Sequence, residues 1–225
     1  MLVAAPVHAI LLDGLRGMGY QCEVHESIKQ EQAASLIADC EGVITSTRLY
    51  LGKELLDAAP RLRWIGRMGS GMEVIDTGYA ALKGVFCASS PEGNSNAVAE
   101  HAIGLLLAVL RRIPWSHAEM KEGIWQREEN RGHELEGKTV GIIGYGHTGA
   151  AFARRLAGFD VRVLAYDKYQ TPPHVPTHVT ACPSLDSIYN EADIVSFHVP
   201  LQDDTIRYLN DTFLQAMRKP CLLIN

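Results

Sequence analysis

A glycine-rich segment in the second half of the chain constrains its fold more than any other feature. Residues 144–149 read Gly-Tyr-Gly-His-Thr-Gly and directly follow an apolar run from Thr139 to Ile143. A helical pattern comes next, and a second apolar run, Val161 to Tyr166, ends at Asp167, 18 residues after the last glycine. A strand, this glycine pattern, a helix, a second strand and an acid about 20 residues on make up a dinucleotide-binding unit. A purely structural turn is the alternative.

Each position in this segment has a physical role. Gly144 permits the tight turn, Gly146 lets the backbone approach a pyrophosphate, and Gly149 lets helix and strand pack closely. The helix that begins there offers unpaired N–H groups and a positive dipole end to phosphates. Asp167 is placed to accept hydrogen bonds from a ribose 2′-hydroxyl. The segment therefore predicts a nucleotide site.

Length and composition exclude several other classes of protein. The 225 residues can form one large domain or two small ones, and a net charge of −5 gives no reason to propose nucleic acid or an anionic membrane as a partner. The longest apolar run, Ala102 to Leu110, is too short to span a bilayer. The N-terminus lacks the basic region of a signal peptide. Five cysteines without a CxxC pair favour reduced, buried thiols in a cytoplasmic protein.

Strand and helix patterns alternate through the first 90 residues or so. Such alternation is typical of a parallel sheet covered by helices on both faces. The patterns predict strands over 21–25, 42–46, 62–65 and 85–88, and helices over 7–18, 32–38 and 53–59. We therefore expect a small doubly wound, flavodoxin-like domain at residues 1–93.

A long apolar helix is predicted after a boundary at Pro91-Glu-Gly93. Asn94 or Ser95 can cap it. Residues 97–110 are apolar nearly all round, which predicts burial on more than one side. The helix is either a core element or, in part, also a subunit interface. Pro114 is expected to end or kink it, and residues 120–133 to form a surface loop.

The second domain, 94–225, continues as a Rossmann-type unit. After the first two strands we expect a Pro-rich loop at Thr171–Pro176, helices over 185–190 and 211–217, and strands over 193–198 and 221–225. A sheet with strand order 3-2-1-4-5-6 needs about two more strands. The sequence therefore looks truncated within this domain. Both predicted domains are α/β with doubly wound parallel sheets.

Several motifs, in order, resemble the D-isomer-specific 2-hydroxyacid dehydrogenases and within them the phosphoglycerate dehydrogenase-like branch. Besides the glycine segment, the matching stretches are 66–76, 94–101, 120–125, 134–138 and His198-Val-Pro-Leu201. The resemblance extends over nearly all of the chain. It implies a first domain that binds a small 2-hydroxy or 2-keto acid, a second that binds NAD, and a homodimer.

The resemblance also assigns roles to residues. Ser70 and Gly71 match the loop whose amides hold the substrate carboxylate, with Ser70 also touching nicotinamide. Arg48 lies near a position where phosphate-handling members carry arginine. The matched cofactor residues are the glycines of the fingerprint with His147 and Thr148 at the pyrophosphate, and Asp167 at the ribose with a preference for NAD over NADP. Val199 and Pro200 match the stretch that lines the adenosine side, and His198 closes the preceding strand near the cofactor.

Two departures and one absence limit this assignment. Ser46 stands where an arginine of phosphate-handling members aligns, and Val74 replaces the asparagine usual in the Gly-rich substrate loop. Both departures put phosphoglycerate itself in doubt as the substrate. The catalytic arginine of the family follows an Asn-x-Ala-Arg-Gly motif whose first residue matches Asn225. No residue of this chain matches that arginine or the glutamate and histidine of the acid–base pair, so we expect no catalytic residue here.

The histidines offer no substitute. His101 is predicted to be a satisfied structural histidine in a buried helix, and His198 to have a backbone and packing role. The others form no HxxxH or paired-carboxylate pattern, so no metal site is expected. One alternative to an enzyme is a non-catalytic NAD(H)-binding sensor or scaffold of the corepressor type. Another is a chain that binds nothing because its sheet has an exposed edge.

Overall fold

The computed structural model of the chain describes residues 1–169 and 175–225. The predicted Pro-rich loop at 171–176 lies largely outside the described residues, as does His174. The chain divides into two compact units, Met1–Asn94 and Ser95–Asn225, and the sequence placed a domain boundary after Gly93. Both units contain a five-stranded parallel sheet, so the predicted fold class is confirmed.

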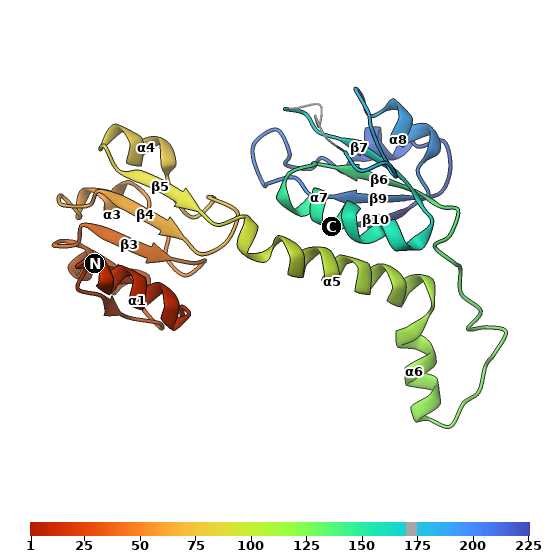
Figure 1. Cartoon of the computed structure of the whole chain (residues 1–225), viewed down its shortest axis with the longest axis horizontal. Helices are drawn as coiled ribbons and strands as arrows, with labels where there is room; N and C mark the ends of the chain where they lie inside the picture. The colour runs from red at the N-terminus through yellow and green to blue at the C-terminus, as the bar shows by residue number, and fades with distance from the viewer. Residues whose placement is uncertain (170–174) are drawn as a thin grey trace. The chain divides into compact units, whose positions relative to one another are not determined.

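The first unit has the strand order β2-β1-β3-β4-β5, which is the flavodoxin-like order 2-1-3-4-5. Its strands are β1 (Leu2–Val3), β2 (Glu23–Val24), β3 (Gly42–Thr45), β4 (Trp64–Arg67) and β5 (Phe86–Ser89). Its helices are α1 (Ala9–Gly17), α2 (Gln30–Ile37), α3 (Lys53–Asp57) and α4 (Thr77–Leu82). Figure 1 shows the arrows of β3, β4 and β5 side by side.

Two elements of the first unit were not predicted. The strand β1 has only two residues, so its apolar run is too short to show a period. The helix α4 has six residues and begins after Asp76, whose carboxylate accepts a hydrogen bond from Tyr79 N at 2.9 Å. An aspartate before a short apolar segment is an N-cap signal, and it could have revealed this helix.

The second unit has the strand order β10-β9-β6-β7-β8. Numbered from β6 as strand 1 and read from the β8 edge, this order is 3-2-1-4-5, the beginning of the Rossmann order. The strands are β6 (Thr139–Ile143), β7 (Arg162–Tyr166), β8 (Val179–Ala181), β9 (Ile194–Phe197) and β10 (Leu222–Ile224), and the helices are α7 (His147–Leu156), η1 (Ala157–Phe159), α8 (Asp186–Glu191) and α9 (Asp211–Ala216). The three-residue β8 was missed.

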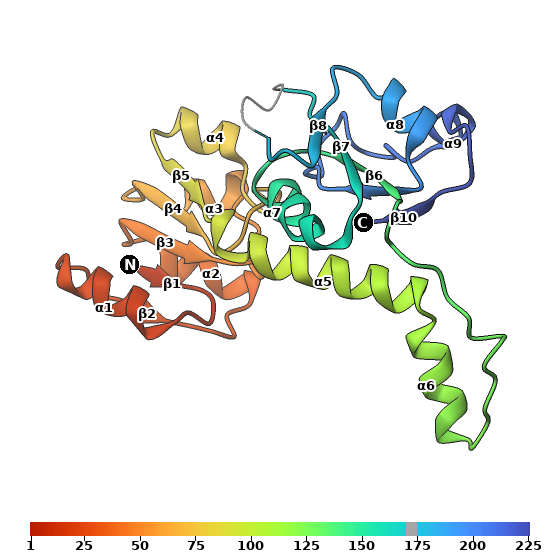
Figure 2. The same cartoon turned by 45° about the vertical axis from the view of Figure 1, so that its right-hand side comes forward.

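Alternate residues of β6 pack on opposite faces of this sheet. Val140 and Ile142 belong to a buried cluster with Phe152 of α7. Ile143 belongs to a second cluster with Ile188 of α8. The helices α7 and α8 therefore cover opposite faces, and Figure 2 shows them on either side of the strands. The glycine segment lies where β6 passes into α7.

The long helix differs from its prediction at both ends. It is α5 (Glu92–Leu110) and begins before Asn94 and Ser95, so neither residue caps it. Pro91 directly precedes its first residue, and the fixed φ of proline suits the start of a helix. At the other end, Pro114 lies in the first turn of a separate helix, α6 (Ile113–Lys121), so the expected loop at 120–133 begins later than predicted.

The prediction that α5 is buried on more than one side is wrong for this chain. Its buried residues are Ser95, Ala99, Ala102 and Leu106, which recur at helical spacing on one face. A second apolar face carries Val98, Leu105 and Val109, each more than 40% exposed. His101 is also exposed, so its predicted burial is wrong.

Two further expectations concern the cysteines, expected as reduced and buried thiols, and the lack of an apolar run long enough to span a bilayer. All five cysteines are free, but only Cys40 and Cys182 are buried. No described helix is long and apolar enough to cross a membrane.

Candidate functional site

The glycine segment forms a tight loop between β6 and α7. Gly144 has a φ of +89°, and a Cβ there would lie 2.6 Å from the carbonyl oxygen of His198. A Cβ on Gly149 would lie 2.1 Å from the carbonyl oxygen of Gly144. Gly146 is different, because a Cβ there would meet no atom within 4 Å. Two of the glycines are therefore required by the fold, whereas the third leaves open space at the start of α7.

Asp167 follows β7 and binds the glycine loop directly. Its Oδ2 accepts a hydrogen bond from Tyr145 N at 2.8 Å, and its Oδ1 accepts one from Tyr169 N at 3.0 Å. The peptide N–H of Gly144 also donates to Tyr166 O at 2.8 Å. The carboxylate thus ties the loop to the end of the neighbouring strand, a role that the spacing rule did not predict.

A pocket of about 130 Å³ opens beside this loop. It brings together six residues predicted for the cofactor site, namely Gly144, Gly146, Asp167, His198, Val199 and Pro200. His147, Thr148 and Gly149 stand in the first turn of α7, outside the described lining of the pocket. The lining also includes residues that the sequence did not single out: Ile143, Tyr166, Lys168, Tyr169, Gln202, Asp204, Thr205 and Tyr208.

His198 has a neutral imidazole in this pocket. Its backbone N–H donates to Ile143 O at 2.7 Å, and its Nε2 lies 2.8 Å from Ser196 Oγ. The ring centroid is 5.2 Å from that of Phe152. Burial lowers the pKa of His198 from 6.5 to about 4, because desolvation penalises the charged form. A neutral histidine with these partners positions the end of β9.

The predicted substrate residues lie at the carboxyl ends of two neighbouring strands of the first unit. Arg48 is exposed after β3, and Ser70 is exposed after β4, followed by the half-buried Gly71. A hydrogen bond of 2.7 Å from Met68 N to Thr45 O joins the two strand ends. Loops at the carboxyl ends of parallel strands are where doubly wound folds bind ligands.

An ion pair between a buried arginine and an exposed glutamate supports the Ser70 loop. Arg67, 8% exposed, donates from Nη2 to Glu73 Oε1 at 2.9 Å. Gly69 has a φ of +133°, and a Cβ there would lie 2.1 Å from Arg67 Nη1. The backbone of Gly69 also accepts a hydrogen bond from Ser90 N at 2.9 Å. The loop is therefore held in one shape with the backbone close to the arginine.

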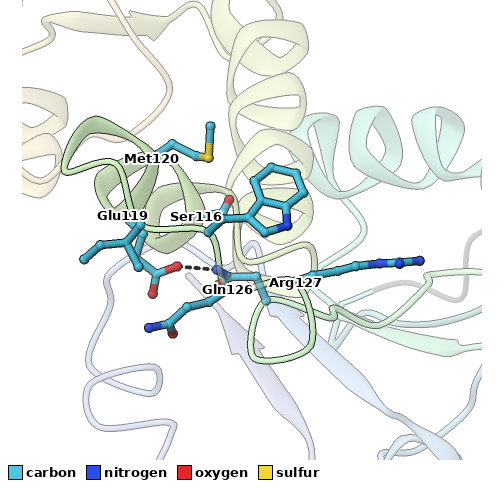
Figure 3. A pocket seen from close by; sticks show the side chains of 8 residues that line it. Ser116, Glu119, Met120, Gln126 and Arg127 are labelled. Carbon is cyan, nitrogen blue, oxygen red and sulfur yellow. Dashed lines mark hydrogen bonds between the residues drawn. The ribbon is translucent and has the colours of Figure 1, made fainter.

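A second pocket, of about 150 Å³, lies between α6 and the segment that follows it. Figure 3 shows its side chains, among them Ser116, Glu119 and Met120 of α6 opposite Gln126 and Arg127. Asn130 donates a hydrogen bond to Glu119 across it. This pocket contains none of the residues predicted to bind cofactor or substrate.

Within residues 1–169 and 175–225, no group of three or more histidine, cysteine, aspartate or glutamate side chains is arranged to hold a metal ion. The groups that could hold a cofactor are instead the amide donors of the loop, the first turn of α7 and the Asp167 carboxylate, which accepts hydrogen bonds.

Comparison with known proteins agrees with this geometry. Residues 103–225 match the family described as D-isomer specific 2-hydroxyacid dehydrogenase, NAD binding domain. The D-3-phosphoglycerate dehydrogenase of Archaeoglobus fulgidus is 31% identical over 225 residues, which are 100% of this chain and 43% of that protein. The chain thus spans less than half of the length of that relative.

Solved structures have the same arrangement of elements. The TT0316 protein from Thermus thermophilus superposes with a TM-score of 0.83 at 30% identity, over 99% of this chain and 71% of that one. An NAD-dependent formate dehydrogenase from Staphylococcus aureus, in complex with NAD, gives a TM-score of 0.82 at 27% identity, over 99% and 72%. The NAD expected from the sequence is the cofactor that the matched family binds. With the family match covering more than half of its residues, the chain belongs to the D-isomer-specific 2-hydroxyacid dehydrogenases.

Proposed function

We propose that this protein is an NAD-dependent dehydrogenase that moves a hydride between C4 of nicotinamide and C2 of a small 2-hydroxy or 2-keto acid. The observation that carries the proposal is the pocket in which Asp167 and the open backbone of Gly146 face the same space. In this proposal the second unit binds NAD and the first binds the acid. NAD supplies the hydride acceptor or donor, and the protein supplies binding and orientation.

In this proposal different residues of the second unit bind the pyrophosphate, the adenosine ribose and the adenosine of the dinucleotide. The first turn of α7, with Gly146, His147 and Thr148, binds the pyrophosphate, whose negative charge the positive end of the helix dipole favours. Asp167 accepts hydrogen bonds from the adenosine ribose. Val199 and Pro200, which line the pocket after β9, form the apolar wall at the adenosine.

In this proposal the substrate-binding residues of the first unit bind the carboxylate of the 2-hydroxy or 2-keto acid. Successive N–H groups in a turn form a concavity that binds anions, and the loop at Ser70 and Gly71 is held in shape by Arg67 and Glu73. Arg48 adds an exposed cation at the end of the next strand. The departures at Ser46 and Val74 favour a small 2-keto acid without a phosphate.

We expect this 225-residue chain to bind NADH without oxidising it. No residue in it matches the catalytic arginine, glutamate or histidine of the family, and these groups orient the keto acid and move the proton. The test titrates NADH by its fluorescence and then follows its absorbance with pyruvate, glyoxylate or hydroxypyruvate. Saturable binding with no consumption is the expected result. Absence of binding would refute the cofactor assignment, and consumption would show that other residues of this chain serve as the acid–base pair.

A homodimer belongs to the same proposal. Its support is a row of exposed apolar side chains on α5, α6 and the following segment, which mark an interaction surface: Val98, Leu105, Val109, Ile113, Trp115, Met120, Ile124 and Trp125. Light scattering should give twice the 24.7 kDa of one chain, and replacing Trp125, 75% exposed, with aspartate should halve that mass. A single-chain mass for the unaltered protein at micromolar concentration would contradict the dimer.

We also assign the protein to the cytoplasm, because all five cysteines are free and reduced thiols are usual there. A tagged protein recovered from the medium instead of the cytoplasmic fraction would contradict this assignment.

A further inference from the structure

Two loops of the second unit are joined by an ion pair across the edge of the cofactor pocket. Lys168 follows Asp167 at the end of β7, and its Nζ lies 2.5 Å from Asp204 Oδ2 on the loop after β9. The hydroxyl of Tyr169 donates to the same oxygen at 3.3 Å. The Lys168 ammonium also lies 5.5 Å from the centre of the Tyr169 ring. All three side chains line the pocket with Asp167.

The ion pair between Lys168 and Asp204 contributes one positive and one negative charge next to Asp167. Asp167 and Asp204 contribute two negative charges to the described lining, and Lys168 is the one lysine or arginine in it. The hydrogen bond between Lys168 and Asp204 raises the pKa of Lys168 and lowers the pKa of Asp204, so both side chains are charged at neutral pH. Within the described lining, the wall beside the expected ribose site is therefore net negative, and the Lys168 ammonium is paired with Asp204.

We propose that Asp204 is a specificity-determining residue, which excludes NADP by holding Lys168 in an ion pair beside Asp167. The inference rests on the proposed binding of NAD in this pocket, where Asp167 would meet the ribose 2′-hydroxyl. In NADP that hydroxyl carries a phosphate with a charge of about −1.5 to −2 at pH 7. Two carboxylates repel this group, and a lysine bound to one of them is not available to neutralise it.

The geometry makes Lys168 the natural partner of a 2′-phosphate once Asp204 no longer holds it. Lysine carries a compact charge on a flexible four-carbon stem and binds phosphate as a point charge. The side chains of Lys168 and Asp204 are 58% and 35% exposed. An exposed pair of this kind contributes little to folding, so its removal should alter cofactor selection and leave the fold intact.

The test compares Asp204→Asn with Asp203→Asn, which removes the same charge from the adjacent exposed residue outside the described lining of the pocket. Dissociation constants for NADH and NADPH are measured for both variants and for the unaltered chain. In Asp204→Asn, we expect NADPH to bind about tenfold more tightly and NADH to change by less than about threefold, the scale of one hydrogen bond to a charged group. Asp203→Asn should leave the ratio of the two constants within about twofold, since Asp203 is exposed and lies outside the described lining of the pocket.

A second variant tests whether Lys168 is the group that binds the 2′-phosphate of NADPH. Adding Lys168→Met to Asp204→Asn should abolish the gain in NADPH affinity, and a gain that persists would overturn the role of Lys168. An unaltered chain that binds NADH, with no larger NADPH gain in Asp204→Asn than in Asp203→Asn, would refute this inference alone. An unaltered chain that binds neither nucleotide would refute the proposed function, and this inference with it.

Discussion

Replacing Gly149 with alanine should destabilise the second unit by about 3 kcal/mol or more, at the upper end of the cost of overpacking a close-packed interior. The new Cβ would lie 2.1 Å from the carbonyl oxygen and 3.1 Å from the carbonyl carbon of Gly144, and 3.3 Å from a methyl group of Ile142. Backbone atoms cannot rotate away as a flexible side chain can. Gly144 is itself fixed by its hydrogen bond to Tyr166 O and by the nearby carbonyl of His198.

Urea unfolding followed by circular dichroism measures this loss. Gly158→Ala is the matched control, because Gly158 lies in the same unit, has no positive φ, and a Cβ there would meet nothing within 4 Å. That variant should be neutral, or more stable by up to about 1 kcal/mol, because alanine restricts the unfolded chain. A Gly149→Ala protein as stable as the Gly158→Ala protein would show that α7 does not need this close approach.

Replacing Gly146 with alanine should have the opposite profile: an intact fold and lost cofactor binding. Gly146 has a φ of −74°, which suits alanine, and its Cβ would enter space with no atom within 4 Å. We therefore expect the free energy of unfolding to change by less than about 0.5 kcal/mol, as is usual where no packing or polar contact is lost. The proposed pyrophosphate would lie against this backbone, and a methyl group there would displace it. A fall in NADH affinity of about 100-fold or more is expected, equivalent to about 2.7 kcal/mol.

The two variants together separate the structural and the binding roles of one loop. Their positions are three residues apart, so differences in expression or surface charge cannot explain a divergence. Equal NADH affinity of Gly146→Ala and the unaltered chain would place the pyrophosphate elsewhere.

The parts of the site that sequence could predict are those encoded by local pattern. The strand β6, the glycine loop, α7 and β7 are consecutive, and each carries its own signal of apolar run, glycine spacing or helical period. That unit could therefore be placed from sequence with an error of a few residues. The largest error is at the start of α7, which begins at His147, whereas the helical pattern in the sequence begins at Ala150. The alternation of strands and helices along the chain also predicted doubly wound parallel sheets, because parallel crossover connections follow few topologies.

The parts that sequence could not predict depend on distant residues. Lys168 and Asp204 are 36 residues apart, and they meet because β7 and β9 flank β6 in the sheet. Neither is marked by a periodic pattern. The contact of Asp167 with Tyr145 N likewise arises from the turn geometry. On α5, composition could not distinguish a face that packs within this chain from one that is exposed, since both are apolar.

The location of NADH on the folded chain tests most directly whether the glycine loop and Asp167 form the cofactor site. Backbone amide resonances of the isotopically labelled protein can be followed as NADH is added to saturation. We expect shifts at residues 144–149, 167–169 and 198–205, and none of comparable size at the α6 pocket formed by residues 116–130. Shifts centred on that second pocket, or no shifts at saturating NADH in a folded protein, would contradict this location of the cofactor site.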